Sequence, residues 1–379
     1  GQTWLKGGSI AGATDQELFD RIILGRKPAN SEALIKAAKL LSAFRLLGVK
    51  HPLTDLEVVA KLGRSMSAED LRAALDDLHQ RGVVQAHGRL VSLQPKPLAF
   101  ALAERQWTEW PEAVWDEVLA GSLAPHLRER AAQQLAMLND RPKSFEVAKY
   151  VQRFSGPLAS LESLRRKGNH DVIDALSEVD GETTVGLLEH ILLPLNMEQL
   201  RAIDGELRRG FVRALEKLAF ASNTFERSAI LMLRLAAAEN EDWGNNATGL
   251  FKDFFPVFLG GTEADGEARL RLLDDLIRKN DPTEMAVVVD ALLHGSETNH
   301  HSRMVGAETH GSRPALESWQ PRFWKDVWDY VSACMERLVK LAVKSDKVGE
   351  VARVGVAHRL RTLISGGLID EVETWVKTI

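Results

Sequence analysis

The sequence has few of the residues and motifs that most often carry chemistry or membrane insertion. Its 379 residues include one cysteine, Cys334, which excludes an internal disulfide framework and a zinc site built from several cysteines. It contains no run of about 18 apolar residues, so we expect no segment that spans a membrane. The net charge is only −5, which does not favour a general binder of nucleic acid or of anionic membranes. Together these absences favour a soluble protein of the cytoplasm, where thiols stay reduced.

Phosphate-binding and catalytic motifs are also missing. Gly7, Gly8 and Gly12 lie close together, but no Gly-Lys-Ser/Thr follows and no buried strand precedes them, so we expect no nucleotide site. No Gly-x-Ser-x-Gly sequence and no standard set of metal ligands is present. We therefore predict no catalytic residue, no cofactor and no metal, although sequence alone does not reveal a site assembled in space. The chain begins with Gly1 rather than methionine, and we expect it to be a piece of a longer protein.

Residues 31–97 have the pattern of a winged helix, after a flexible lead-in with one short helix over residues 1–30. Apolar residues at helical spacing predict a first helix over 31–47 and a second one after Thr54. A third helix begins at Ser67, whose hydroxyl can cap it. Two short strands at 83–87 and 89–93 then meet at a glycine. Three helices followed by a two-stranded hairpin are typical of winged helices.

Winged helices often bind DNA through the third helix. In this chain that helix carries four acidic residues (Glu69, Asp70, Asp76, Asp77) against two basic ones (Arg72, Arg81), a poor surface to place beside phosphates. Over 31–97 as a whole, ten Lys and Arg face seven Asp and Glu. We favour a packing or regulatory module, and nucleic acid is not expected as a partner. The alternative is a DNA-binding regulator whose remaining helices form an effector or dimerisation domain.

Residues 98–379 predict helix after helix, joined by short connectors that contain Gly, Pro, Asn or Asp. Neither of the helices at 206–221 and 224–240 can bury its apolar stripe alone, so the pair must stack on others. The fold class predicted is therefore mainly α, a winged helix followed by a solenoid of HEAT-like or tetratricopeptide-like helix pairs. Thr224 is the expected N-cap of the second helix in this pair. The remaining predicted spans are 98–107, 111–120, 122–138, 142–153, 157–166, 169–179, 182–193, 197–202, 246–258, 264–279, 282–294, 322–344, 346–365 and 368–379.

Several residues of this region invite a functional interpretation beside a structural one. Trp107, Trp110 and Trp115 lie close in sequence, and rings at this spacing more often pack between domains than form a ligand cage. Cys334 falls on an apolar helical stripe that also includes Phe323, so we expect a buried structural thiol. Neither set is predicted to be a site.

Two polar segments are the candidate partner-binding sites. The insertion around Asn245 and Asn246 is expected to cap a helix, with surface hydrogen bonding to a partner as the alternative. The loop 295–320 is the longest stretch without a clear period, and such loops are often functional. Its candidates for contacts with a partner are Arg303, Glu308, His310 and Arg313. A metal site that uses His300, His301 and His310 with Glu297 and Glu308 is disfavoured because the spacing matches no standard ligand pattern.

Two stretches carry a resemblance to a known family. The run ALEKLAFASNTFERSAILMLRLAAAENEDWGNNATGLFKDFFPVFLGGTEADGEARLRLLDDLI, and later GAETHGSRPALESWQPRFWKDVWDY, resemble large bacterial signal-transduction NTPases of the STAND type. The resemblance is most specific over about 206–330. It implies a helical sensor or scaffold region of a multidomain switch that binds a protein partner or its own NTPase domain, and some members of the family serve antiphage defence. Because the chain has no phosphate-binding lysine loop, no catalytic or nucleotide-binding residue carries over.

Overall fold

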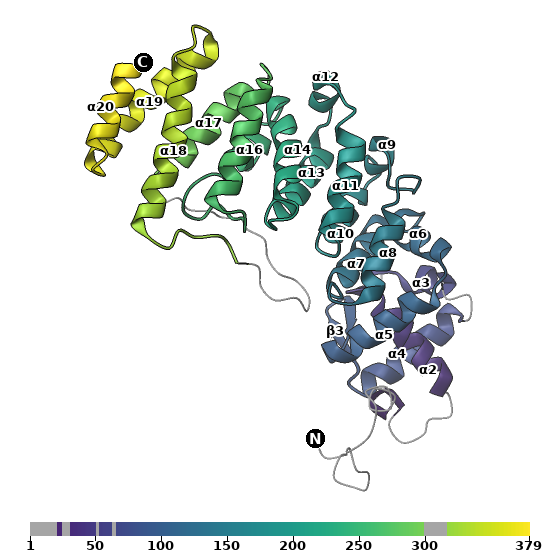
Figure 1. Ribbon diagram of the computed structural model, residues 1–379. Helices are drawn as coiled ribbons and strands as arrows, with labels where there is room; N and C mark the ends of the chain where they lie inside the picture. Colours follow the sequence, from purple (N-terminus) through teal and green to yellow (C-terminus); the bar gives the residue numbers. More distant parts are fainter. Residues whose placement is uncertain (1–20, 25–30, 51–52, 63–65, 299–316) are drawn as a thin grey trace. The chain divides into compact units, whose positions relative to one another are not determined.

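The computed structural model describes residues 21–24, 31–50, 53–62, 66–298 and 317–379, and it is mainly helical (Figure 1). This confirms the mainly helical class predicted from the sequence. The chain divides into two compact units. Unit 1 contains Gly1–Val151, Gly156–Leu158 and Lys167–Val179, and unit 2 contains Gln152–Ser155, Ala159–Arg166 and Asp180–Ile379. The domain boundary expected at 97/98 stays a prediction.

Unit 1 begins with helices and a small antiparallel sheet. The helices are α2 (Ser31–Ser42), α3 (Leu56–Leu62) and α4 (Ala68–Gln80), and the strands are β1 (Leu47–Lys50), β2 (Leu53–Thr54), β3 (Val84–His87) and β4 (Leu90–Leu93). The strand order is β2-β1-β4-β3, and β3 and β4 form the predicted hairpin. The Ser67 hydroxyl accepts a hydrogen bond from the backbone N–H of Asp70 at 3.0 Å and caps α4, as the sequence predicted.

The first helix is shorter than the sequence suggested. The prediction carried it through Leu47, whereas α2 ends at Ser42 and Leu47 starts β1, which pairs with β4. A buried side chain, Asp55, holds this strand in place: its carboxylate accepts from the backbone N–H of Gly48 at 2.7 Å, and its own backbone N–H donates to the Gly48 carbonyl. Tertiary pairing therefore overrides a helical spacing of apolar residues.

The rest of unit 1 is helical. It contains α5 (Lys96–Glu109), α6 (Glu112–Ala120), α7 (Pro125–Ala136), α8 (Pro142–Val151) and α10 (Asn169–Ser177). Trp107, Trp110 and Trp115 are all buried and all belong to unit 1, and their packing between the predicted domains stays a prediction. The rings of Trp107 and Trp110 meet edge to face at 5.1 Å, and the Trp115 indole donates to the Trp107 carbonyl at 3.0 Å.

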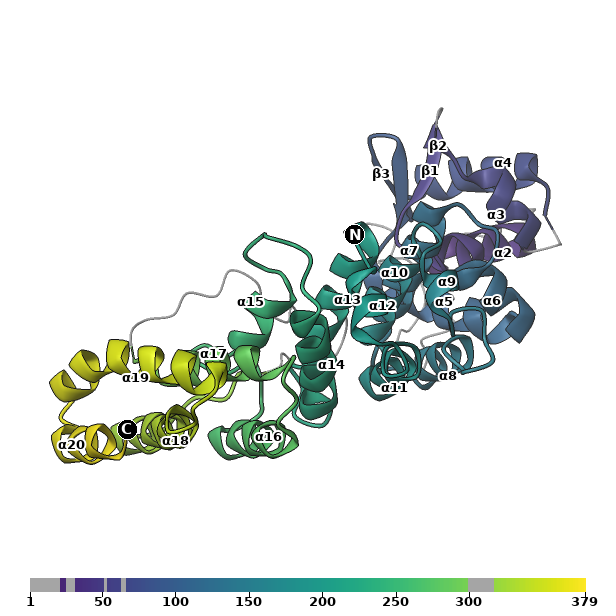
Figure 2. The same cartoon turned by 90° about the horizontal axis from the view of Figure 1, so that it is seen from above.

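Unit 2 is a succession of helices. They are α9 (Leu161–Leu164), α11 (Gly181–Leu192), α12 (Met197–Arg201), α13 (Gly205–Leu218), α14 (Phe225–Ala237), α15 (Ala247–Lys252), α16 (Gly266–Lys279), α17 (Met285–Gly295), α18 (Trp324–Ala342), α19 (Lys347–Ser365) and α20 (Ile369–Thr378). In Figure 2, α16, α18 and α20 lie in one layer and α15, α17 and α19 in the other. The apolar stripes of the helices face each other between the layers, and the buried Leu, Val and Phe side chains form the core there.

Two helix lengths predicted in this part of the chain were wrong. The helix expected over 157–166 is only the single turn α9, because a capping box at Ser160 starts it late. The helix expected over 246–258 ends at Lys252, since the residue before Pro256 is disfavoured in helical geometry. Thr224 occupies the N-cap position of α14, as predicted, but its hydroxyl donates to the Leu218 carbonyl and makes no capping bond.

Two buried arginines connect the ends of helices in unit 2. Arg208 is the fourth residue of α13 and Arg269 the fourth of α16, and each follows the sequence Asp-Gly-Glu and one further residue. The Arg208 guanidinium donates to the carbonyls of Leu200, Ile203, Leu235 and Ala238 at 2.7–3.4 Å and pairs with Glu239. The Arg269 guanidinium donates to the carbonyls of Pro256 and Ala264 at 2.8 and 2.9 Å. Both side chains satisfy carbonyl oxygens that helix ends and loops would otherwise leave unpaired.

Candidate partner-binding site

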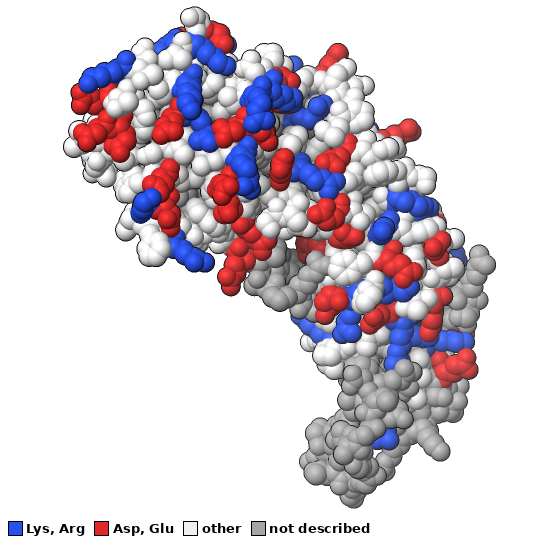
Figure 3. Space-filling view, in the orientation of Figure 1, with Lys and Arg blue, Asp and Glu red and all other residues white. Residues whose placement is uncertain are grey.

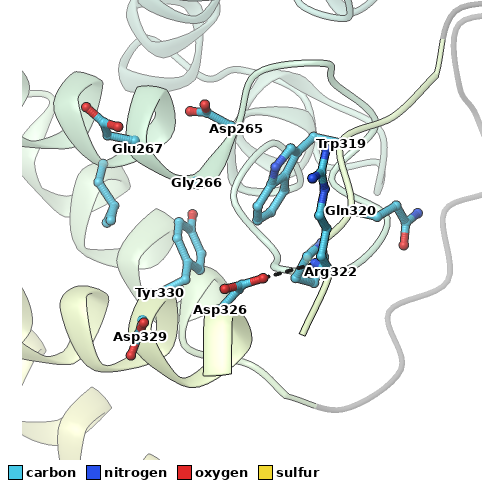
Figure 4. Close-up of a pocket in the computed structure, with 11 residues that line it drawn as sticks. Asp265, Gly266, Glu267, Trp319, Gln320, Arg322, Asp326, Asp329 and Tyr330 are labelled. Carbon is cyan, nitrogen blue, oxygen red and sulfur yellow. Dashed lines mark hydrogen bonds between the residues drawn. The ribbon is translucent and has the colours of Figure 1, made fainter. Parts of the chain in front are cut away.

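A pocket of about 780 Å³ lies in unit 2, between the first turns of α16 and α18 and the segment that leads into α18 (Figure 4). This volume falls within the roughly 300–1,000 Å³ of ligand pockets. The lining residues are Asp265, Gly266, Glu267, Leu270, Trp319, Gln320, Pro321, Arg322, Asp326, Asp329 and Tyr330. They come from two segments more than 45 residues apart in the sequence, so the fold alone brings them together.

Helix capping fixes the two acidic corners of the pocket. Asp265 accepts a hydrogen bond from the backbone N–H of Ala268 at 2.8 Å and caps α16. One carboxylate oxygen of Asp326 accepts from the backbone N–H groups of Arg322 and Phe323, at 3.1 and 2.9 Å, and so fixes the approach to α18 (Figure 4). In both places a carboxylate meets the positive end of a helix, which stabilises the helix start.

Tyr330 lines the aromatic side of the pocket, and a hydrogen bond to a backbone carbonyl fixes its ring. The Tyr330 hydroxyl donates to the Phe255 carbonyl at 2.8 Å, and burial raises the pKa of Tyr330 well above its usual value. Burial likewise raises the pKa of the neighbouring Cys334 thiol to about 12. Both groups therefore stay protonated at neutral pH, and neither acts as a base or nucleophile. Cys334 is buried and its thiol is free, which confirms the predicted buried thiol.

Arg269 supports Trp319 and shapes the loop beside it. Its guanidinium lies over the Trp319 ring, 5.1 Å from the centroid. A Cβ atom at Gly260 would come within 2.7 Å of the Arg269 guanidinium, so the loop passes this side chain only as glycine. The preceding residue, Leu259, adopts a positive φ of 55°, which is strained for a branched residue, and its side chain is exposed. The Arg269 guanidinium therefore lies against both the Trp319 ring and the backbone at Gly260.

An apolar rim, defined as Phe258, Leu259, Phe323 and Trp324, includes two residues that lie in the chain between the pocket-lining residues Arg322 and Asp326. Phe323 and Trp324 are 70% and 69% exposed, and the Trp324 ring meets the Phe258 ring at 6.2 Å. The sequence placed Phe323 on the buried stripe of α18. That prediction was wrong, because Phe323 precedes the helix and turns outward. Adjacent exposed aromatic residues beside a pocket are typical of interaction sites.

Charge in the pocket is predominantly negative. Four carboxylates line it (Asp265, Glu267, Asp326 and Asp329) against one basic side chain, Arg322. Glu267 forms an ion pair with Arg271, one helical turn later, and Asp329 with Lys325, one turn earlier, and all four of these side chains are largely exposed. Elsewhere on the face of unit 2 shown in Figure 3, basic and acidic side chains alternate.

Of the candidate residues predicted from the sequence, the structure describes Asn245 and Asn246. Arg303, Glu308, His310 and Arg313 lie outside the described residues, as do His300 and His301. Asn246 caps α15: its side-chain oxygen accepts from the Gly249 N–H at 2.8 Å, and its amide donates to the Glu241 carbonyl at 2.8 Å. This supports the capping interpretation. Asn245 is exposed, and partner contacts there stay a prediction.

Other candidate chemistry finds little support in the described parts of the chain. Within the described residues, no group of three or more His, Cys, Asp and Glu is arranged to hold a metal ion. Glu297, which would belong to the disfavoured histidine metal site, forms an ion pair with Arg359. A search of the described helices for a long apolar stretch finds none that could cross a membrane.

Sequence reasoning missed the pocket, but two signals were available. The Asp-Gly-Glu-x-Arg sequence occurs at 204–208 and again at 265–269, which marks two equivalent helix starts. The run Arg322-Phe323-Trp324 places two large aromatic residues beside a charged one at a helix start, outside the helical apolar spacing. Comparison with known proteins adds no relative: no protein-family model, no curated protein and no solved structure matches the chain.

Proposed function

We propose that the chain is a non-catalytic interaction region that binds a protein partner through the pocket and the apolar rim of unit 2. The observation that carries this is the pair of exposed aromatic side chains, Phe323 and Trp324, in the segment that connects the pocket-lining residues Arg322 and Asp326. Exposed aromatic anchors beside a cavity are the usual energetic centre of protein interfaces. Stacked helices supply the rigid frame that holds such anchors in place.

The resemblance over 206–330 extends this proposal to the parent protein. The chain would be the sensor or scaffold region of a cytoplasmic signal-transduction NTPase of the STAND type, active in defence against phage. Unit 2 would belong to a solenoid of HEAT-like or tetratricopeptide-like pairs. Partner binding at unit 2 would shift an inactive arrangement toward an active one, which requires that the partner bind the active arrangement more tightly.

Residues 31–97 would be a winged helix that relays the signal. The order of α2, α3, α4 and the β3–β4 hairpin supports this proposal, as does the strand β1 beside β4. Asp55, at the start of α3, pairs with His126 and Arg130 of α7 at 2.8 and 3.3 Å. Because this carboxylate also holds β1, the small sheet and the helices of unit 1 are fastened to one another, as a lever requires.

DNA binding by this segment is not proposed. On α4 the exposed charges include Glu69, Asp70 and Asp76 against Arg72. Asp77 engages Arg81 in an ion pair at 2.6 Å, which lowers the capacity of that arginine to bind phosphate.

Site-specific photo-crosslinking in the cells that carry the gene tests the proposal. A benzoylphenylalanine placed at Trp324 of the full protein should cross-link one protein, identified by mass spectrometry, during signalling. The same group at Ile369, an equally exposed apolar position on α20, is the matched control. The cross-link at Trp324 should disappear when Phe323 is changed to Ser. Equal yields at both positions would contradict the proposal. The STAND assignment is tested separately, because it predicts an upstream phosphate-binding loop in the same open reading frame.

A further inference from the structure

We propose that the chain pairs with a second copy of itself through the outer face of α19, with the two helices antiparallel. This surface lies on a different helix from the pocket and its apolar rim, so the inference goes beyond the proposed function. Three features of α19 lead to it: the apolar residues that it exposes, the charges beside them and the spacing of both along the helix.

The outer face of α19 carries apolar residues that remain exposed in the chain. Val354 and Ile364 are 53% and 47% exposed. The buried residues Ala352, Val356 and Leu363 fall on the opposite face by helical spacing, toward α17, α18 and α20 (Figure 2). The exposed residues of α19 are Lys347, Glu350, Val354, Ala357, His358, Arg361, Ile364 and Ser365.

The exposed face of α16 is built differently. The exposed residues of that helix are all charged: Glu267, Arg271, Asp275, Arg278 and Lys279. Glu267 pairs with Arg271, and Asp275 with Arg278, at 2.7 and 2.8 Å. The face of α16 thus pairs its charges within the helix and exposes no apolar side chain. A helical face that exposes valine and isoleucine instead, as α19 does, is typical of an interface.

Glu350 and Arg361 on the outer face of α19 are too far apart to pair with each other. Eleven residues, close to three helical turns, separate them. They therefore lie on the same face of the helix but about 16 Å apart along its axis. Within the described residues neither side chain is found in an ion pair. Each charge is thus available to a group from outside this helix.

An antiparallel second copy of α19 supplies the matching groups. Glu350 and Arg361 are placed symmetrically about the same point of the helix as Val354 and Ala357. With a two-fold axis through that point, Glu350 of each copy faces Arg361 of the other, and Val354 faces Ala357. A parallel pair would instead set Glu350 against Glu350 and Arg361 against Arg361. Charge complementarity therefore selects the antiparallel arrangement.

The outer ends of this face match in the same arrangement. Lys347 and Ile364 are symmetric about the same point, so the aliphatic stem of Lys347 can cover Ile364 of the second copy while its ammonium stays in water. One pair of 19-residue helices buries less surface than a stable dimer usually does. We therefore expect a weak dimer, with a Kd on the order of 10–100 μM.

Sedimentation equilibrium of the full chain tests the proposal. Between about 5 μM and about 1 mM chain, the unmodified protein should change from monomer to dimer. E350R and R361E should each raise the Kd at least about tenfold, because a two-fold axis makes each substitution act twice. The swap E350R/R361E should return the Kd to within about threefold of the unmodified value, since it forms the same pairs with the signs exchanged. This rescue cannot arise inside one copy, where the two residues are three turns apart.

Two controls complete the test. E226R reverses an exposed acidic residue in the first turn of α14, as E350R does in α19, and should leave the Kd unchanged. F323S/W324S should also leave it unchanged, because the dimer does not use the apolar rim. Circular dichroism checks that every variant is folded. A chain that stays monomeric throughout, single variants that dimerise like the unmodified chain, or a swap that fails to restore the dimer would overturn the proposal.

Discussion

The starts of α13 and α16 share a sequence but not a structural role. Both carry Asp-Gly-Glu, one variable residue and a buried arginine, at 204–208 and at 265–269. At α13 the arginine is enclosed by four carbonyls and Glu239. At α16 the arginine has two carbonyls and an aromatic ring, and a pocket lies beside it. The comparison teaches that one helix-start motif builds a closed joint or an open site, depending on the segment packed against it.

Burial of the two arginines has opposite consequences for their surroundings. Desolvation lowers the pKa of Arg208, and Glu239 opposes this shift, so the guanidinium stays charged in a joint made of protein groups. Arg269 instead lies over the Trp319 ring and leaves no room for a side chain at Gly260. We expect substitutions at equivalent positions to affect stability at both sites but binding only at α16.

Removing the arginines should have the largest effect. R208M and R269M should each lower the free energy of unfolding by about 3–5 kcal/mol, because several buried carbonyl oxygens lose their donor. Guanidinium denaturation followed by circular dichroism measures this loss. In chains labelled with 5-fluorotryptophan, only R269M should also shift the fluorine NMR signal of Trp319 under native conditions. A comparable shift in R208M would contradict the distinction between a closed joint at α13 and an open site at α16.

Substitution of the glycine at each of the two helix starts should have the next largest effect on stability. G266A places a Cβ atom 2.9 Å from the Tyr330 ring. Because the hydrogen bond from the Tyr330 hydroxyl to the Phe255 carbonyl holds this ring in place, we expect G266A to lower the free energy of unfolding by about 2 kcal/mol. G205A meets open space, but Gly205 has a φ of 56°, which should cost only about 1 kcal/mol. Equal stability losses in the two variants would argue against the packing of Tyr330 described above.

The aspartates offer a finer comparison. Asp265 caps α16 through the Ala268 N–H, whereas the Asp204 side chain makes no capping bond at α13. D265A should therefore lose about 1 kcal/mol of stability, and D204A should stay within about 0.5 kcal/mol of the parent chain. Thermal or chemical unfolding of the two variants side by side decides this. A larger loss in D204A would show that the motif works alike at both helices.

A smaller loss of stability is expected at alkaline pH, from the ionisation of the Cys334 thiol beside Tyr330. The folded pKa of Cys334, about 12, lies above its unperturbed value of 9.0. The stability that comes from keeping this thiol protonated is therefore fully present below pH 9. It is lost as the pH rises toward 12, because only the thiol of the unfolded chain ionises in that range. This predicts a loss of about 0.7 kcal/mol between pH 8.5 and 9.5. C334A should show a correspondingly shallower slope of unfolding free energy against pH. Identical slopes would contradict the burial of this thiol.

Much of the frame was predictable because it depends on local patterns. Helical spacing located most helices, Ser67 and Asn246 were recognised as caps, and the burial of Trp107 and Cys334 followed from residue type and stripe. Strand β1 was missed because only four residues form it, and its partner β4 lies about 40 residues away. Short strands that depend on such distant pairing leave little trace in local periodicity.

The pocket was not predictable for a related reason. Its walls come from 265–270 and from 319–330, and only the folded chain brings these segments together. The exposed position of Phe323 reversed its predicted role, because a helical stripe does not tell where the first turn begins. The repeated Asp-Gly-Glu-x-Arg sequence marks the helix starts, yet it does not distinguish the joint from the site.

The affinity of the cross-linked partner for variants of the apolar rim tests the central claim most directly. F323S/W324S and the control I369S would be compared with the parent chain by calorimetric titration, using the partner identified at Trp324. We predict a loss of at least about thirtyfold for F323S/W324S, as expected for aromatic anchors, and less than about twofold for I369S. Unchanged affinity in F323S/W324S, with both variants as stable as the parent chain, would contradict the claim that this surface binds the partner.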